Sequence, residues 1–282
     1  MTFVQGLLAG ANELRHKAHL FKIRKPFIYE GLKFLFFSFI LVFIAVQGIN
    51  GLDYRWQWYR MPDYFYKISD SGFIAGPLFT GLGLTLLISA ISLILSNLIG
   101  FITALFRLSD SVTAVAVSRI YLEVVRNTPL LIQLFLVYFV ISPILGIGRM
   151  VSAIMALSLF EGAYTSEIIR SGIISIEKGQ WEAAHSIGLT GVQTYRRIIL
   201  PQAFGQVMPM LASQSISLVK DSALISTIAI YELTMQGQVA ISKSFLTFEV
   251  WFSVAAIYLI INICLSMIIR IFEQNKKRQK NA

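Results

Sequence analysis

Residues 80–105 read TGLGLTLLISAISLILSNLIGFITAL, and no charged residue interrupts them. A helix needs about 20 consecutive, mainly apolar residues to cross the hydrocarbon core of a bilayer. The stretch meets that requirement, so we predict that it forms a membrane-spanning helix. Small residues within it, Gly81, Gly83 and Thr85 among them, favour close contact with another helix.

The rest of the chain has the same apolar character. Of its 282 residues, 56% are hydrophobic and only 14% are charged, whereas a soluble domain carries about 25% charged residues. Five further apolar segments are close to spanning length, and they cover residues 32–49, 129–147, 151–169, 204–230 and 250–271. The sequence therefore predicts an all-α, polytopic membrane protein with about six transmembrane helices.

The formal net charge is +9, and the positions of the basic residues explain it. Four basic clusters lie in residues 15–25, 107–126, 170–197 and 276–280. With six spans all four clusters fall on one side of the membrane, and the positive-inside rule makes that side the cytoplasm. We therefore expect both termini and the loop 171–201 to be cytoplasmic. Nucleic acid is disfavoured as a partner, because the charge follows the membrane segments.

Motifs that would make the chain an enzyme are absent from the sequence. Gly81-Leu82-Gly83 and Gly146-Ile147-Gly148 are too short to cradle a phosphate, and no Walker A sequence occurs. The single cysteine, Cys264, lies in an apolar run, and no metal-binding motif is present. We expect no catalytic residue, metal or cofactor on this chain, which disfavours a polytopic membrane enzyme.

The loop between the apolar segments 151–169 and 204–230 has a distinct pattern. Helical spacing predicts a short helix over residues 178–187, with Trp181, Ala184 and Ile187 on one face. Gly188 is suited to end that helix in a left-handed cap.

A second helix is predicted over residues 192–199, stopping before Pro201. The loop is then a helix-turn-helix shaped to dock into a groove of another protein. The alternative is a simple amphipathic surface helix.

This loop resembles the EAA motif of ABC importer permeases. The signature positions are occupied by Glu182, Ala183, Ala184, Gly188, Ile198, Leu200 and Pro201. Other stretches resemble the polar amino acid uptake branch of the same superfamily, namely residues 126–131, 162–164, 167–170, 178–181 and 220–222. The resemblance covers about residues 76–272, and it leaves out the first apolar segment and both tails.

The resemblance implies a type I importer permease core over residues 76–272, with the coupling loop at 171–201. Residues 1–75 then supply a cytoplasmic tail, an extra span and an outer loop, and residues 273–282 supply a basic cytoplasmic tail. In the family the coupling loop sits in a groove of a separate ATPase dimer, which binds ATP and Mg²⁺. Glu182 is expected to orient the loop by hydrogen bonding, and Gly188 to supply a turn.

The same resemblance implies further partners and a location. A second permease, identical or related, completes the path, and an extracytoplasmic binding protein delivers the amino acid. The location is the bacterial cytoplasmic membrane. The chief alternative is a secondary transporter driven by an ion gradient, but that class favours inverted repeats and paired broken helices. An exporter or channel is disfavoured by the coupling loop.

Polar residues in the apolar segment 151–169 are candidates for the substrate path. Ser158, Glu161 and Thr165 share a helical face with Ile154, and Tyr164 lies beside them. Ionisable residues within spans are costly and mark function by default. Glu161 would meet a cationic side chain or the α-ammonium group of any amino acid. The alternative is a structural carboxylate paired to another helix.

Three other polar groups have mainly structural interpretations. Glu167 and Arg170 are spaced to pair on one helix face. Lys220 and Asp221 are adjacent, which indicates two different partners or a helix break capped by Asp221 and Ser222, with gating as the alternative. Residues 127–129, Asn-Thr-Pro, are typical of a helix start.

Overall fold

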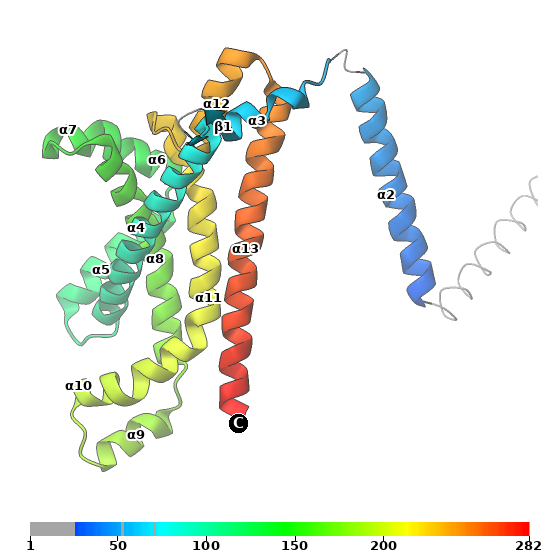
Figure 1. Ribbon diagram of the computed structural model, residues 1–282. Helices are drawn as coiled ribbons and strands as arrows, with labels where there is room; N and C mark the ends of the chain where they lie inside the picture. The colour runs from blue at the N-terminus through cyan, green and yellow to red at the C-terminus, as the bar shows by residue number, and fades with distance from the viewer. Residues whose placement is uncertain (1–25, 52–53, 70–71, 282) are drawn as a thin grey trace, which may run out of the picture. The chain divides into compact units, whose positions relative to one another are not determined.

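The computed structural model describes residues 26–51, 54–69 and 72–281 (Figure 1). The chain divides into two compact units, Met1–Trp56 and Gln57–Ala282. In the first unit, helix α2 spans Pro26–Gly51. Phe34, Phe39 and Leu41 are 72%, 69% and 70% exposed, and residues 30–48 are long and apolar enough to cross a membrane. A helix that is apolar on all sides is suited to a lipid environment.

The second unit opens with short elements. They are η1 Trp58–Arg60, α3 Pro62–Phe65, and the strands β1 Tyr66–Ser69 and β2 Gly72–Ala75. The strands form an antiparallel hairpin in which Tyr66 lies opposite Ala75. Among the described residues, this hairpin is the exception to the predicted all-α fold.

Helices form the rest of this unit. Up to the coupling loop they are α4 Pro77–Arg107, α5 Val112–Arg126, α6 Leu130–Phe135, the π-helical η2 Leu136–Ile141, α7 Ser142–Leu145 and α8 Arg149–Ile174. The coupling loop contains α9 Lys178–Ser186, α10 Gly191–Thr194 and the π-helical η3 Tyr195–Ile199. Then follow α11 Leu200–Asp221, the 3₁₀ helix η4 Ser222–Ile228, α12 Leu233–Ser244 and α13 Thr247–Asn281.

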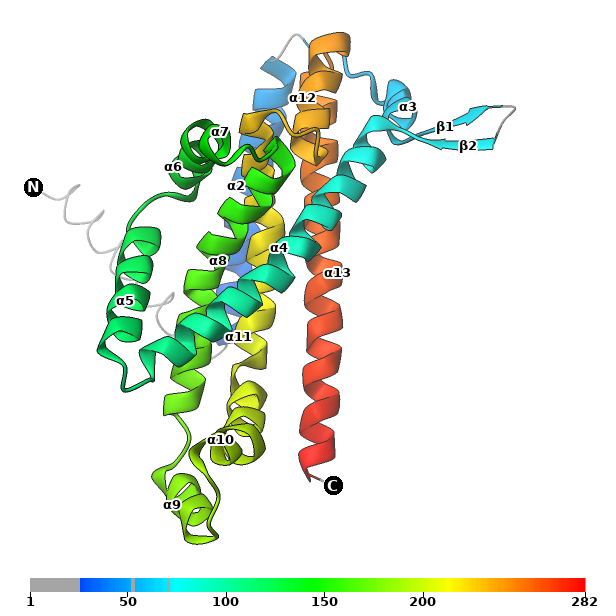
Figure 2. The ribbon, with the colours of Figure 1, turned by 90° about the vertical axis from the view of Figure 1, so that its left-hand side faces the viewer.

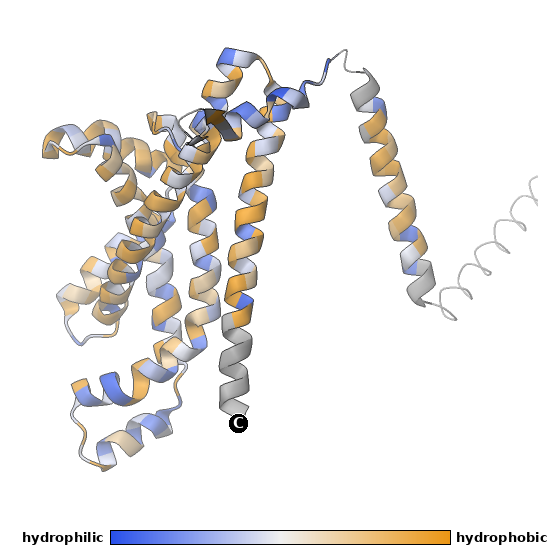
Figure 3. Cartoon of the chain, viewed as in Figure 1, coloured by the Kyte–Doolittle hydropathy of each residue, from blue (hydrophilic) through white to orange (hydrophobic). Residues whose placement is uncertain are grey.

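Helices α8, α11 and α13 run alongside one another, and α4 crosses them at an angle (Figures 1 and 2). The helices α9 and α10 lie at the same end of this bundle as the C-terminal end of α13. The elements α12, α3 and the β-hairpin lie at the opposite end. Figure 3 shows the corresponding change in polarity, because α4 and α13 are mainly hydrophobic whereas α9 and α10 are mainly hydrophilic.

Small residues set the close contact between α4 and α8. A Cβ atom on Gly100 would lie 2.6 Å from the Thr165 side chain, and one on Gly162 would lie 2.9 Å from Ile99. The contact predicted for the start of α4 is also present, because a Cβ atom on Gly81 would lie 2.7 Å from Gln236 of α12. Gly83, in contrast, faces open space. Close backbone approach through small residues is a common way of packing membrane helices.

Among the described residues, three helices are long and apolar enough to cross a membrane, at residues 30–48, 77–107 and 247–271. The pair 112–126 and 130–145 meets the same test together, but it is bent by 108°. The predicted fourth and fifth spans, now α8 and α11, are too polar for this test. Two of their polar side chains pair with each other, because Gln214 of α11 donates a hydrogen bond to Glu161 of α8.

The predicted third span needs a correction. Its region is a helical run of 16 residues from Leu130 to Leu145, preceded by a separate helix, α5. From hydropathy alone, the α5 segment is expected to be part of a cytoplasmic stretch. Its charged residues, including Arg119 and Glu123, hide the helix because they lower the apparent hydropathy.

Candidate functional site

The coupling loop has a defined helix-turn-helix geometry. Helix α9 forms where the spacing predicted it, and Gly188 ends it with a φ of +78°. The N–H of Gly188 donates to the His185 carbonyl at 2.9 Å, and that of Leu189 to the Ala184 carbonyl at 3.1 Å. Thr190 then opens α10 through a capping box with Gln193. Both sides of the turn are therefore closed by hydrogen bonds.

The inner face of the loop is anchored to the helical bundle. Ala184 is buried, and the Trp181 ring packs edge-on against the Tyr195 ring. Both aromatic rings join an apolar cluster with Ile173 of α8 and Ala203 of α11. Burial raises the pKa of the Tyr195 hydroxyl, and the negative charge of nearby Asp110 adds to the effect. The loop is thus packed against the ends of the helices that it joins.

The outer face of the loop offers side chains to the surroundings. Ile187 is 73% exposed and Val192 is 79% exposed, so Ile187 does not share the buried face of Trp181 and Ala184 as predicted. The reason is that α9 ends at Ser186, and Ile187 already belongs to the turn. Glu182 is exposed, and its carboxylate makes no hydrogen bond within the described part of the chain. It does not orient the loop internally, and it is free to contact a partner.

The second helix of the loop does not stop before Pro201. It continues from α10 through the π-turn η3 into α11, with Pro201 near the start of α11. A proline inside a regular helix lacks one N–H donor and clashes with the carbonyl group four residues earlier. The wider π-turn at Tyr195–Ile199 accommodates that conflict. Of the remaining signature residues, Ile198 and Leu200 are half-buried, whereas Ala183 and Pro201 are exposed.

The predicted polar face of α8 is closed in this conformation. Ser158, Glu161 and Thr165 are each 1–2% exposed. Glu161 Oε2 accepts a hydrogen bond from Gln214 Nε2 of α11, and Ser158 Oγ donates to the Ile154 carbonyl at 2.6 Å. Glu161 Oε1 is buried and accepts no hydrogen bond from the described N–H donors, and the Asp221 carboxyl group interacts with this carboxylate. Glu161 therefore bridges two helices, which is the structural alternative for it.

The helix break at Lys220 and Asp221 is present. Helix α11 ends at Asp221 and the 3₁₀ helix η4 begins at Ser222. The predicted capping is absent, because the Asp221 side chain caps no backbone N–H, and Ser222 Oγ donates to the Val219 carbonyl at 2.7 Å instead. The Asp221 carboxyl group interacts with that of Glu161, whereas Lys220 is exposed. The two adjacent charges thus face different surroundings, as expected on a helix.

The predicted pair of Glu167 and Arg170 is confirmed, with Glu167 Oε1 and Arg170 Nη2 2.5 Å apart. Two more arginines join it. Arg107 of α4 forms an ion pair with Glu167 Oε2, and Arg126 of α5 lies 4.0 Å from the same oxygen. One carboxylate therefore links α4, α5 and α8. Since three guanidinium groups surround it, the cluster has a surplus of positive charge that favours an anion nearby.

A polar cavity of about 280 Å³ lies beside this cluster. It is lined by Leu122, Glu123, Arg126, Asn127 and Tyr164, and we call it the Arg126 pocket. The Arg126 guanidinium lies 5.8 Å from the centre of the Tyr164 ring, and Asn127 Nδ2 donates to Glu123 Oε2 at 2.9 Å. The pocket thus presents a cation, a carboxylate, an amide and an aromatic face.

Of the residues that line this pocket, only Tyr164 is a candidate from the sequence. Arg126 belongs to a basic cytoplasmic cluster there, and residues 127–129 are interpreted as a helix start. The sequence signal that could have pointed to this pocket is the run RNTPLL at residues 126–131, in which a charged residue and a proline directly precede an apolar segment. In the structure Asn127 and Thr128 cap the end of α5 rather than the start of α6, because their side chains donate to the Glu123 and Val124 carbonyls.

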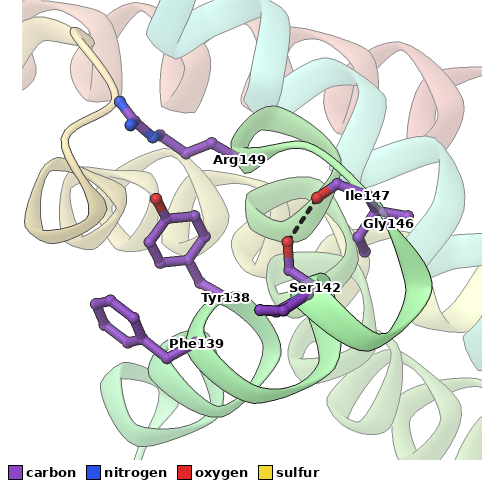
Figure 4. Close-up of a pocket in the computed structure, with 7 residues that line it drawn as sticks. Tyr138, Phe139, Ser142, Gly146, Ile147 and Arg149 are labelled. Atoms are coloured by element: carbon purple, nitrogen blue, oxygen red, sulfur yellow. Dashed lines mark hydrogen bonds between the residues drawn. The ribbon is translucent and has the colours of Figure 1, made fainter.

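A second cavity, of about 460 Å³, lies near the start of α8 (Figure 4). Its lining residues are Tyr138, Phe139, Ser142, Pro143, Gly146, Ile147 and Arg149. Arg149 lies 6.0 Å from the centre of the Tyr138 ring and donates to the Ala229 carbonyl at 2.8 Å. None of these lining residues carries a carboxylate, so Arg149 supplies the charge of this cavity, whereas the Arg126 pocket has both signs of charge.

The fold and these sites define a helical, polytopic membrane protein with a helix-turn-helix loop at one end of its bundle. Residues 96–278 match the family described as binding-protein-dependent transport system inner membrane component. The chain belongs to this family, so it is a membrane component of a transport system.

Individual relatives cover the same region. The glutamine transport system permease protein GlnP of Escherichia coli (strain K12) is 36% identical, over 71% of this chain and 93% of that protein. The L-cystine transport system permease protein TcyB of Bacillus subtilis (strain 168) is 37% identical, over 70% and 86% of the two chains. A crystal structure of an amino acid ABC transporter with histidines matches with a TM-score of 0.66 and 34% identity, over 71% and 94% of the two chains.

Proposed function

We propose that this chain is the permease subunit of an ATP-driven importer for polar amino acids. The observation that carries the proposal is the Arg126 pocket, which presents both signs of charge in a chain of this transport family. The relatives named for glutamine and cystine transport support the same class of substrate.

The pocket matches the common part of every amino acid. A guanidinium such as that of Arg126 binds a carboxylate in a fork-like geometry, and the Glu123 carboxylate is suited to an ammonium group. Asn127 adds an amide, and Tyr164 an aromatic face. The substrate side chain then has to be recognised elsewhere. Glu161, Ser158 and Thr165 lie on the same helix as Tyr164, and we propose that they join the path when α8 and α11 separate.

The coupling loop is the proposed docking site for a separate ATPase dimer, which would hold ATP and Mg²⁺. The exposed Ile187 and Val192 offer apolar contacts, and the Glu182 carboxylate is free for hydrogen bonding. A second permease, identical or related, would complete the translocation path. An extracytoplasmic binding protein would deliver the substrate, as the name of the family implies.

We propose the bacterial cytoplasmic membrane as the location, with both termini in the cytoplasm. The coupling loop carries Lys178, Arg196 and Arg197, and it lies at the same end of the bundle as the C-terminal end of α13. Basic segments remain on the cytoplasmic side. The β-hairpin and α12 would then face the outside.

The first test concerns the partner. A tagged chain is purified from its native membrane in mild detergent, and the proteins that accompany it are identified by mass spectrometry. We expect an ATPase with a Walker A sequence, which is lost in the variant Glu182→Ala with Gly188→Val. The matched control is Glu177→Ala, because Glu177 is likewise exposed, just before α9. Uptake that needs an ion gradient and survives ATP depletion would favour a secondary transporter instead.

The second test concerns the pocket. Binding of the twenty common L-amino acids to the purified complex is measured by equilibrium dialysis. Arg126→Ala should weaken the best binder by about 10- to 100-fold, since a hydrogen bond to a charged group contributes about 1.5–3 kcal/mol. Arg119→Ala is the control, because Arg119 is an exposed arginine on the same helix that does not line the pocket. Unchanged binding in Arg126→Ala would refute the assignment of the pocket.

A further inference from the structure

The bend between α5 and α6 leaves two backbone carbonyl groups without their helical donors. The chain turns by 108° at residues 127–129. Pro129 has no N–H, so the Val125 carbonyl, four residues earlier, loses its donor. The N–H groups of Ile132 and Gln133 both donate to the Pro129 carbonyl, so the Thr128 carbonyl receives neither of them. An unpaired carbonyl away from water is costly.

The side chain of Gln133 supplies the missing donors. Its Nε2 atom lies 2.7 Å from the Val125 carbonyl oxygen, 3.0 Å from the Thr128 carbonyl oxygen and 2.7 Å from Thr128 Oγ1. An amide nitrogen carries two hydrogen atoms, so one bonds to Val125 and the other is shared by the two Thr128 oxygens. One side chain of α6 thus holds both sides of the bend.

The two backbone carbonyl groups just before Val125, those of Glu123 and Val124, accept side-chain hydrogen bonds as well. Asn127 Nδ2 donates to the Glu123 carbonyl at 2.8 Å, and Thr128 Oγ1 donates to the Val124 carbonyl at 2.8 Å. Asn127 also donates to the Glu123 carboxylate, which lines the Arg126 pocket. The end of α5 is therefore closed by side chains in a network that continues into the pocket.

We infer that Gln133 is a positioning residue for the Arg126 pocket. It does not line the pocket, and it acts by holding the Val125 and Thr128 carbonyls, which flank Arg126 and Asn127 in sequence. Without it the end of α5 would fray, and the Arg126 guanidinium would lose its set position against the Tyr164 ring and Glu167. This inference rests on the proposed function, because it assigns Gln133 to the amino acid site.

The test compares three substitutions at this position. Gln133→Leu and Gln133→Glu both remove the N–H donors, and Gln133→Lys restores donors on a side chain of similar length. In the purified complex we expect the first two to weaken the best-binding L-amino acid about tenfold, and the third to recover most of that affinity. Gln206→Leu is the control, because Gln206 is an exposed glutamine of α11 outside the pocket.

A second measurement reports on the bend without any substrate. Val124→Cys and Ile132→Cys place spin labels on two exposed positions, 58% and 53% accessible, on either side of the bend. Cys264→Ser removes the single native thiol. The distance distribution from pulsed electron resonance should be narrow in the parent chain, broad with Gln133→Leu and narrow again with Gln133→Lys.

The outcomes separate the inference from the function on which it rests. Weaker binding together with a broader distance distribution, both reversed by lysine, supports the positioning role. Parent-like binding in Gln133→Leu, with Arg126→Ala defective, overturns the inference alone, whatever the spin labels report. Parent-like binding in Arg126→Ala overturns the pocket and the inference with it.

Discussion

The rings of Trp181 in α9 and Tyr195 in η3 meet edge-on, with their centres 5.1 Å apart and their planes at 80°. This contact joins the first helix of the coupling loop to the helix that continues into α11. A force applied to α9 therefore reaches α11 through side chains as well as through the turn at Gly188. In the proposed function, this contact transmits movement of the ATPase to the permease.

Trp181→Ala should uncouple the loop. An edge-to-face aromatic pair contributes about 0.5–1.5 kcal/mol beyond its buried area, and the variant also leaves a gap in the apolar cluster of Ile173 and Ala203. We expect a several-fold loss of the ATPase activity that the binding protein stimulates in nanodiscs, with normal assembly of the complex. Trp181→Phe should retain most of the activity. Full stimulation in Trp181→Ala would mean that the ring contact does not carry the coupling.

Gly188→Val should distort the turn between the two loop helices. Gly188 has a φ of +78°, and a left-handed conformation costs an L-residue about 1–2 kcal/mol. Gly188→Asn should be milder, because asparagine tolerates this conformation better. The recovery of the ATPase with the purified chain measures the effect. Recovery with the valine variant equal to that of the parent would show that the turn is adaptable.

Gly172→Ala should push α8 and α11 apart. A Cβ atom on Gly172 would overlap with Val207 Cγ1 of α11, and such overpacking typically costs about 1–3 kcal/mol. We expect a lower midpoint of thermal unfolding in detergent, and partial recovery when Val207→Ala is added.

Gly179→Ala is the matched control for that experiment. Gly179 lies in α9, and a Cβ atom added there would have no neighbouring atom within 4 Å. Alanine at this position should therefore be neutral or stabilising by up to about 1 kcal/mol. Equal midpoints for the two alanine variants would show that the bundle relaxes around the added methyl group at Gly172.

Glu161→Gln should impair transport while the ATPase still docks. The amide can keep a hydrogen bond to Gln214 of α11, so the helices should remain packed, but the negative charge is lost. Uptake of the best-binding amino acid into proteoliposomes tests this expectation, and copurification of the ATPase checks the docking. Normal uptake would remove Glu161 from the substrate path and leave it as a link between α8 and α11.

Local signals in the sequence predict much of the coupling loop. The spacing of Trp181 and Ala184 indicates the buried face of α9, and Gly188 indicates the left-handed turn. These features depend on residues close together in the chain, and the structure confirms them. The continuation of the helix through Pro201 is not predicted, because a π-turn depends on how α11 packs rather than on local preference.

The sequence by itself determined the apolar helices, because crossing a bilayer requires a length and a polarity that can be counted along the chain. Only the tertiary structure decided the candidate site. Arg126, Tyr164 and Glu167 come from two helices, and nothing in their spacing reveals that α5 packs against α8. Likewise, Glu161 and Gln214 are 53 residues apart, and their contact depends on how α8 packs against α11. Polar side chains in an apolar setting are most stable when they pair with each other, and the fold alone determines which partners they reach.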